Sequence, residues 1–171
     1  MAPRLSAQAS SIWPTARAKP RPGWHDVPSF AAKRRLPSVQ AIDTLTPCPC
    51  GNPAGYGACC GPLHDGNVVA ASAAQLMRSR YSAYVLKRED YLLASWHADT
   101  RPASLRLATQ QPAPTWLGLD VRREQRIDDE HATVEFVARY RLGSGRAHRQ
   151  HELSRFVREA GRWYYVDGEL M

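Results

Sequence analysis

Residues 132–142 read Ala132-Thr-Val-Glu-Phe-Val-Ala-Arg-Tyr-Arg-Leu142, with an apolar side chain at every second position. Side chains of a β-strand point alternately to the two faces of a sheet, so this period predicts a strand with one buried face. A similar alternation occurs over residues 117–124, and turns are expected at 128–130, 143–145 and 159–161. With two further segments, 146–158 and 162–167, the pattern predicts four antiparallel strands in a meander.

Upstream of these strands the apolar residues follow a helical period instead. They are Leu76, Met77, Tyr81, Tyr84 and Val85. Ser72 precedes them and Gln75 follows three residues later, which is the pattern of an N-terminal capping box. A second short helix is expected over residues 90–96 with Asp90 as its cap, and a third is expected to begin at Thr100. Helices followed by a curved antiparallel sheet predict an α+β domain with the helices packed on one face.

The first 46 residues differ in composition from the rest of the chain. They hold six of the 13 prolines, seven basic residues and two acidic ones. Each proline removes an amide donor and fixes φ, so we predict a disordered, basic extension over residues 1–46. This extension carries +5 of the net charge of +7, which leaves +2 for residues 47–171. A nearly neutral folded part argues against nucleic acid as the main partner.

No apolar run approaches the ~20 residues of a membrane-spanning helix, and none forms the apolar core of a secretory signal. The chain is therefore expected in the cytoplasm, with no membrane partner. Thiols stay reduced in that compartment, where clustered cysteines more often bind metal than form disulfides.

All four cysteines lie within residues 48–60, in the spacing C-x-C, eight residues, C-C. Four thiolates on so short a loop can converge on one tetrahedral ion. The alternative is a pair of disulfides, although the adjacent Cys59 and Cys60 bridge poorly to each other. We predict a structural Zn²⁺ ion held by Cys48, Cys50, Cys59 and Cys60, with no open position for a water molecule. His64 is a further candidate ligand, but four cysteines already complete the site.

The Cys-Pro-Cys-Gly and Tyr-x-x-Cys-Cys elements of residues 48–60 resemble the SEC-C motif, a small zinc-binding element also found in the SecA translocase. The stretches that follow resemble the YchJ-like proteins of the UPF0225 family. The similar stretches are residues 76–85, 90–97, 116–119, 134–139 and 161–168. This resemblance covers about residues 48–168. It implies a zinc-binding motif over residues 47–64 and an NTF2-like domain over residues 70–171, and it implies no established activity.

NTF2-like folds enclose a pocket between the helices and the sheet. If Phe156 points into the core, a period of two also directs Ser154 and Glu152 inward. Glu152, Ser154 and Tyr140 are therefore candidate residues of a ligand pocket. Glu152 and His97 are candidate catalytic groups, because a carboxylate in such a pocket suits acid–base chemistry.

Both catalytic candidates also have a structural explanation. For Glu152 an ion pair with Arg139 or Arg155 is favoured over a catalytic role, because buried carboxylates are usually paired. His97 follows Trp96 at the end of the second predicted helix, where a histidine commonly interacts with the last carbonyl groups.

Three classes of function fit these features. The favoured one is a non-catalytic adaptor or ligand-binding module, which contacts a protein partner through its zinc knuckle and whose body binds a ligand or forms a homodimer. An enzyme acting on a small molecule is the alternative, although the sequence has no phosphate loop, nucleophile elbow or zinc-protease helix. Weak nucleic-acid association through the basic extension is the second alternative.

Overall fold

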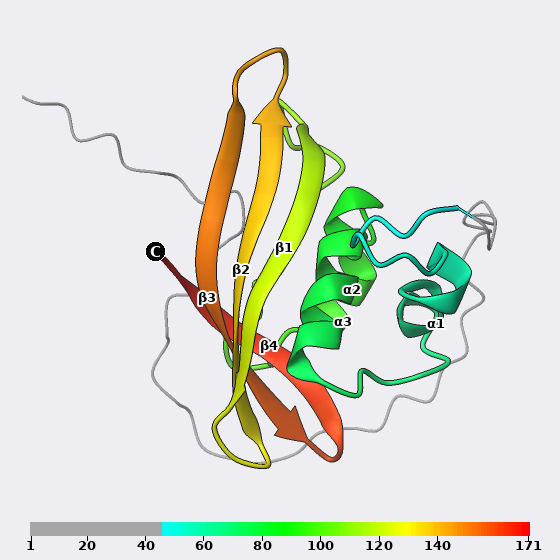
Figure 1. The fold of residues 1–171 in the computed structure, drawn as a ribbon, viewed down its shortest axis with the longest axis vertical. Helices are drawn as coiled ribbons and strands as arrows, with labels where there is room; N and C mark the ends of the chain where they lie inside the picture. The colour runs from blue at the N-terminus through cyan, green and yellow to red at the C-terminus, as the bar shows by residue number, and fades with distance from the viewer. Residues whose placement is uncertain (1–45) are drawn as a thin grey trace, which may run out of the picture.

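Four long antiparallel strands form a single sheet in the order β1-β2-β3-β4 (Figure 1). The computed structural model describes residues 46–171, so the predicted extension lies outside the described residues except at Thr46. The strands are β1 Pro114–Arg126, β2 His131–Leu142, β3 Ala147–Glu159 and β4 Arg162–Leu170. The predicted meander is confirmed. The first strand begins three residues before the alternating pattern of residues 117–124, and the last extends three residues further than predicted.

The period-two pattern of β2 matches its burial. Ala132, Val134, Phe136 and Ala138 are at most 1% exposed, whereas Arg139 on the opposite face is exposed. Register shifts interrupt the ladder twice in β1 and once between Arg155 and Phe156. Such bulges bend a strand and increase its twist, so they give the long sheet the curvature seen in Figure 1.

The helices precede the sheet in the chain and lie on one side of it (Figure 1). They are the 3₁₀ turn η1 Tyr56–Ala58 and the helices α1 Gly61–His64, α2 Ala73–Val85 and α3 Glu89–Ala94. The start of α2 is as predicted: the Ser72 hydroxyl accepts a hydrogen bond from the Gln75 amide at 3.2 Å, while the Gln75 side chain accepts from the Ala71 amide at 2.6 Å. The apolar side of α2 packs against β1, β2 and β4.

The second predicted helix forms as α3, but its predicted cap and the predicted helix at Thr100 were wrong. The short helix α3 begins at Glu89, and its N-terminal position, Arg88, provides no side-chain cap, so Asp90 lies in the first turn instead. No helix forms at Thr100, because the loop that follows is held by Glu89. The Glu89 carboxylate accepts hydrogen bonds from the backbone amides of residues 105–107 at 2.8–3.2 Å. These amides are thereby satisfied outside any helix.

One contiguous core joins the cysteine-containing loop, α2 and the inner face of the sheet. Its fully buried large side chains include Trp96, Tyr81, Phe136, Phe156 and Met77. No helix between residues 46 and 171 is both long enough and apolar enough to cross a membrane.

Candidate functional site

The four cysteine sulfurs meet at one point beside α2. The loop folds back through a bridge between Pro47 and Gly55, which places the first cysteine pair against the second. All four Sγ atoms lie within 4.8 Å of one another. Cys59 Sγ lies 3.7 Å from Cys50 Sγ and 3.8 Å from Cys60 Sγ, and none of the four cysteines is in a disulfide.

These separations fit a tetrahedral metal ion. A Zn–S bond of about 2.3 Å in tetrahedral geometry requires sulfurs about 3.8 Å apart. Burial and the charge of Cys50 raise the pKa of Cys59 to about 12, whereas hydrogen bonds from neighbouring thiols lower the pKa of Cys48. Four thiolates at this spacing therefore need a cation to offset their charge, and a bound metal ion supplies it. The predicted cysteine cluster is thus a site able to bind a metal ion.

The cluster faces the body of the protein. Cys48, Cys50 and Cys60 are at most 4% exposed, while Cys59 is half-buried. Ser82 of α2 donates a hydrogen bond to Cys60 Sγ at 3.3 Å, and its hydroxyl lies 3.7 Å from Cys48 Sγ. An ion held by these sulfurs would therefore join the loop to the longest helix of the domain.

His64 supports the cluster but is not part of it. Its Nε2 lies 2.8 Å from the Ser79 carbonyl oxygen, which can only accept, so Nε2 carries the proton. Its Nδ1 then accepts from the Tyr56 hydroxyl at 2.8 Å. Burial lowers the pKa of His64, which favours the neutral ring that this arrangement needs. Both ring nitrogens are thus occupied by hydrogen bonds that hold η1 and α1 on α2.

Glu152 points into the interior, as the period of two in β3 predicted. Glu152, Ser154 and Phe156 are at most 2% exposed. The carboxylate accepts hydrogen bonds from Gln150 Nε2 at 2.8 Å, from the Ser154 hydroxyl at 2.7 Å and from the Tyr165 hydroxyl at 3.4 Å. These contacts replace the expected ion pair with Arg139 or Arg155.

Arg155 instead pairs with Asp167 on the outer face of the sheet. The buried cation that interacts electrostatically with Glu152 is Arg80, a residue that the sequence analysis did not single out. Arg80 is 3% exposed, and its guanidinium lies 4.9 Å from the ring centre of Trp96 and 4.4 Å from that of Tyr165. It donates to the Leu92 carbonyl and to the Ser95 hydroxyl. Tyr165 therefore connects the two buried charges: Arg80 lies over its ring, and its hydroxyl reaches Glu152.

The stability of the Glu152→Gln variant, measured relative to the wild type, should be greater at neutral pH than at pH 4.5. Burial raises the pKa of Glu152 above the value of about 4.3 expected for an unfolded chain. The carboxyl group thus stabilises the fold at pH values below the unfolded pKa, and that contribution is lost as pH rises through the folded pKa. A glutamine does not ionise, and Gln150 can accommodate it by an amide flip because its Oε1 has no partner among the described residues.

Urea unfolding of both proteins between pH 4.5 and 8 measures this difference. A difference of one unit between the folded and the unfolded pKa corresponds to about 1.4 kcal/mol in the free energy of unfolding, and this sets the size of the expected change. A gap that shrinks as pH rises would show that the carboxylate is stabilised by its hydrogen bonds.

The remaining site candidates lie apart from Glu152. His97 Nε2 pairs with Glu159 Oε1 at 3.1 Å, rather than with the last carbonyls of α3, and the structure records no contact between His97 and Glu152. The Tyr140 ring stacks on His148, with centroids 5.3 Å apart, and contacts Trp116. Ser154 is thus the one predicted pocket residue whose side chain meets the Glu152 carboxylate.

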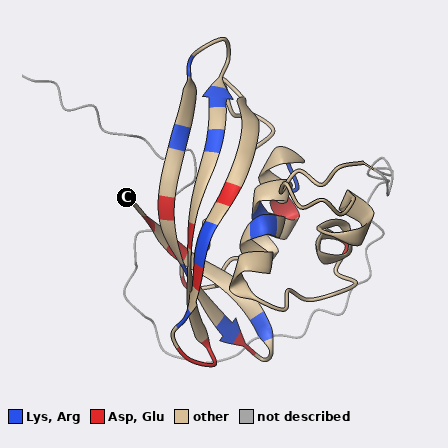
Figure 2. Cartoon of the chain, in the orientation of Figure 1, with Lys and Arg blue, Asp and Glu red and all other residues tan. Residues whose placement is uncertain are grey.

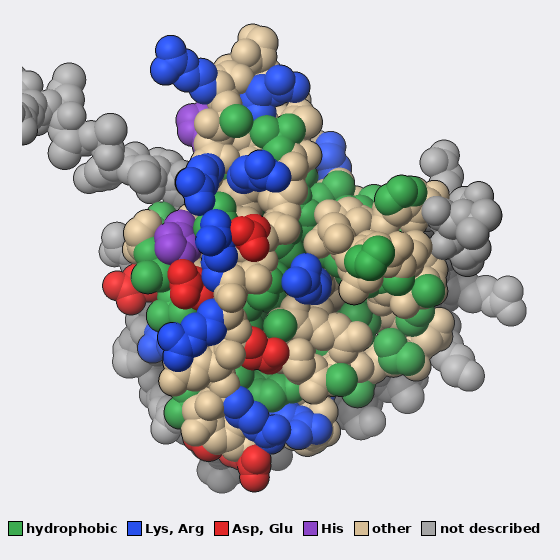
Figure 3. Space-filling model, viewed as in Figure 1, with side chains coloured by type: hydrophobic (Ala, Val, Ile, Leu, Met, Phe, Trp, Pro, Cys, Tyr) green, Lys and Arg blue, Asp and Glu red, His purple; other side chains and the backbone are tan. Residues whose placement is uncertain are grey.

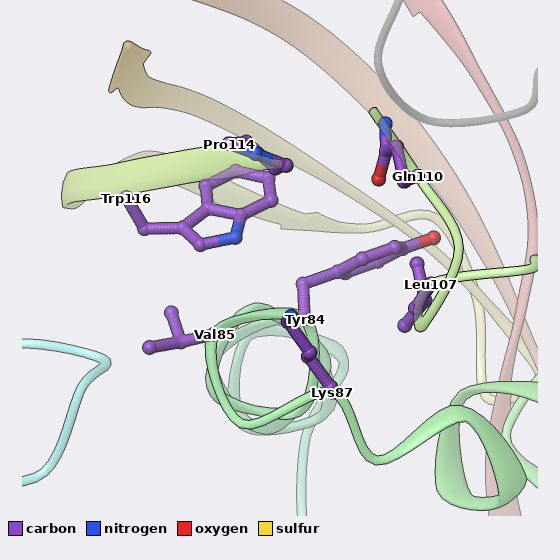
Figure 4. Close-up of a pocket in the computed structure, with 7 residues that line it drawn as sticks. All are labelled: Tyr84, Val85, Lys87, Leu107, Gln110, Pro114 and Trp116. Carbon is purple, nitrogen blue, oxygen red and sulfur yellow. The ribbon is translucent and has the colours of Figure 1, made fainter. Parts of the chain in front are cut away.

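A small cavity does lie between α2 and the start of β1. Its lining includes Tyr84, Lys87, Leu107, Gln110 and Trp116, and Figure 4 shows the Tyr84 ring extending from the helix toward Leu107 and Gln110. Its volume is about 30 Å³. A water molecule needs about 10–15 Å³, whereas pockets for organic ligands reach about 300–1,000 Å³. This cavity therefore suits a few water molecules and not a metabolite.

Comparison with known proteins places this chain in a family. Residues 72–168 match the model of the family described as "YchJ, middle NTF2-like domain". The chain is 58% identical over 132 residues to the UPF0225 protein RSc0270 of Ralstonia nicotianae, which covers 72% of this chain and 90% of that protein. The chain belongs to the UPF0225 family. A UPF0225 protein of Polaromonas naphthalenivorans is 56% identical over 136 residues, with 72% of this chain and 97% of the relative covered.

A solved structure also resembles this UPF0225 chain. It is the solution structure of RPA3114 from Rhodopseudomonas palustris, described as a SEC-C motif containing protein. The TM-score is 0.66 at 38% identity, with 72% of this chain and 98% of RPA3114 covered. The resemblance to UPF0225 and the NTF2-like α+β fold are thus confirmed.

Proposed function

We propose that this UPF0225 protein is a non-catalytic binding module whose four cysteines hold a structural Zn²⁺ ion. One observation carries the proposal: three buried cysteines and one half-buried cysteine lie at the sulfur spacing of tetrahedral zinc, with a helix hydroxyl donating to one of them. Zinc suits this donor set, because four soft thiolates in a closed tetrahedron are typical of structural zinc sites. Four reduced thiols also agree with a cytoplasmic location.

The surface around the cysteine cluster favours a protein as the partner. Between residues 46 and 72 the one acidic side chain is Asp65, and there is no lysine or arginine. Val68 and Val69, in the loop between α1 and α2, are 50% and 56% exposed. Figure 3 shows this lobe, at the right of the view, in tan with scattered hydrophobic groups and with charged side chains only toward its edges. Depletion of charge with exposed apolar groups is typical of the centre of protein–protein interfaces.

The Val68→Asp/Val69→Asp variant should lose its protein partner while keeping its metal. Two carboxylates would be buried without partners in the interface, at a cost that weakens binding at least about tenfold. The measurement is quantitative co-purification from cells that express the tagged full-length chain, together with the zinc content of each sample.

Ile127→Asp is the matched control, since Ile127 is 62% exposed in the turn after β1 and far along the chain from the knuckle. It should retain the partner. Equal loss in both variants, or full retention in both, would show that the lobe around α1 is not the docking surface.

Catalysis on a small molecule has weaker support from the geometry. Such an enzyme would need Glu152 to contact its substrate, yet Glu152 is 1% exposed and its carboxylate already accepts three hydrogen bonds. The cavity beside Tyr84 is too small for an organic substrate. A homodimer formed through the sheet stays a prediction.

A further inference from the structure

The outer face of the sheet, away from the helices, separates its charges by position. Residues 139–149, which form the β2–β3 hairpin and the adjoining strand ends, contain four arginines and no acidic residue. Of the acidic groups of this face, Glu135 pairs with His151 and Asp167 with Arg155 farther from the hairpin. Asp120 on β1 pairs with Arg122. Figure 2 shows the basic segments of β2 and β3 toward the hairpin. The net charge of +2 for residues 47–171 is a sum that hides this separation between the arginine-rich hairpin end and the part of the face that carries paired acidic groups.

The arginines near the hairpin have no acidic partner among the described residues. Arg139, Arg141, Arg146 and Arg149 are exposed, and within residues 46–171 no carboxylate oxygen lies within 4.0 Å of their guanidinium nitrogens. Arg139 and Arg149 occupy directly opposed positions on β2 and β3. Like charges at such positions destabilise a sheet. An anion bound between them would remove this repulsion.

A hollow of about 470 Å³ lies beside this opposed pair. It is lined by Leu119, Asp120, Arg122, Val137, Arg139 and Arg149. Arg122 Nε pairs with Asp120 at 2.7 Å, so Arg139 and Arg149 are the cations of the hollow that have no acidic partner within residues 46–171. Val137, two residues from Arg139 on β2, is only 4% exposed and adds an apolar side chain to the lining. Gly118 leaves space for the Arg139 side chain, because a β-carbon at position 118 would lie only 3.1 Å from Arg139 Nη2.

We infer that this row of arginines binds the phosphodiester backbone of a nucleic acid. The row continues from the hollow through Arg141 to Arg146, which is too extended for one phosphate and suits a ligand with repeating charges. Arginine binds phosphate oxygens bidentately. An acidic protein fits less well, because the lining of the hollow has no aromatic anchor of the kind that dominates protein interfaces. The same lack of aromatic rings predicts contacts to the backbone without base stacking.

Fluorescence polarisation with a labelled single strand of about twenty thymidines tests this inference on the full chain. The Arg139→Gln/Arg149→Gln variant should bind at least about tenfold more weakly at low salt. Its plot of log affinity against log salt should flatten by about 1.4, since each phosphate contact on a single strand contributes about 0.7.

Arg101→Gln/Arg106→Gln is the matched control, because it removes the same charge from exposed arginines before the sheet and leaves the basic residues 1–46 unchanged. It should bind within about twofold of the wild type. Absence of binding by the wild type, equal weakening in both double variants, or tighter binding of poly-glutamate than of the oligonucleotide would overturn the inference.

Discussion

Replacing Cys60 by serine should release the metal and destabilise the whole domain, because the cysteine cluster is attached to α2 through Ser82. Loss of one ligand from a closed four-thiolate site abolishes tight zinc binding, and zinc affinity is folding free energy in such sites. We expect a loss of about 3 kcal/mol or more, or about 10 °C in Tm for a domain of this size. Thermal unfolding by circular dichroism, with zinc measured on the same samples, gives both quantities.

Cys59→Ser distinguishes metal binding from simple packing. Cys60 is 1% exposed, whereas Cys59 is half-buried. If both are ligands, the two variants should lose similar stability, and a chelator should lower the Tm of the wild type without affecting either variant. If the cysteines only pack, the cost should follow burial, and Cys59→Ser should be nearly neutral. Ser82→Ala is the third arm: it should keep the metal and lose only about 1 kcal/mol, the usual value of one hydrogen bond.

Gly168→Ala should destabilise the protein by about 3 kcal/mol, because this glycine gives the buried glutamate its space. A β-carbon at Gly168 would overlap the Glu152 side chain, with Cδ at 2.5 Å and Cγ at 2.9 Å. Overpacking costs about 1–3 kcal/mol, and displacing a buried carboxylate from its donors adds to that. Urea unfolding at pH 7 measures the loss.

A double-mutant cycle assigns the cause. Glu152→Ala removes the atoms that would collide, so Gly168→Ala should cost much less in that background, with a coupling of about 2 kcal/mol between the two sites. The same cost in both backgrounds would mean that Gly168 is needed for its backbone conformation and not for the space that it leaves to the Glu152 side chain.

Much of the fold follows from local patterns in the chain. The period of two over residues 132–142 identified the strand, its buried face and, through β3, the inward direction of Glu152. Ser72 and Gln75 located the start of α2 to the residue. These features depend on neighbours in sequence, so the sequence contains what decides them.

The parts that could not be predicted depend on contacts between distant residues. Nothing local shows that Glu89 holds the amides of residues 105–107, so a helix at Thr100 seemed favourable. The environment of Glu152 likewise needs Gly168 and Tyr165 from β4, and Arg80 from α2, which only the register of the sheet brings together. The C-x-C and C-C spacing predicted the cluster of four cysteines, but not its attachment to α2 through Ser82.

The distribution of charge over the surface also depends on contacts between distant residues. The sequence gives the total for residues 47–171, while the strand pairing places Arg139 opposite Arg149 and both beside one hollow. A nearly neutral total is therefore compatible with a strongly basic surface, and the two surfaces of this protein differ in kind. The lobe around α1 has a single acidic residue and exposes Val68 and Val69, whereas the sheet near the β2–β3 hairpin is rich in arginine.

X-ray absorption spectroscopy at the zinc edge, on the full-length protein purified under reducing conditions, tests the central claim most directly. The four-cysteine site predicts about one zinc per chain, bound by four sulfur atoms at about 2.3 Å with no oxygen or nitrogen ligand. A protein without metal whose thiols are free or paired as disulfides would contradict it. A zinc ion bound mainly by oxygen or nitrogen would contradict it equally.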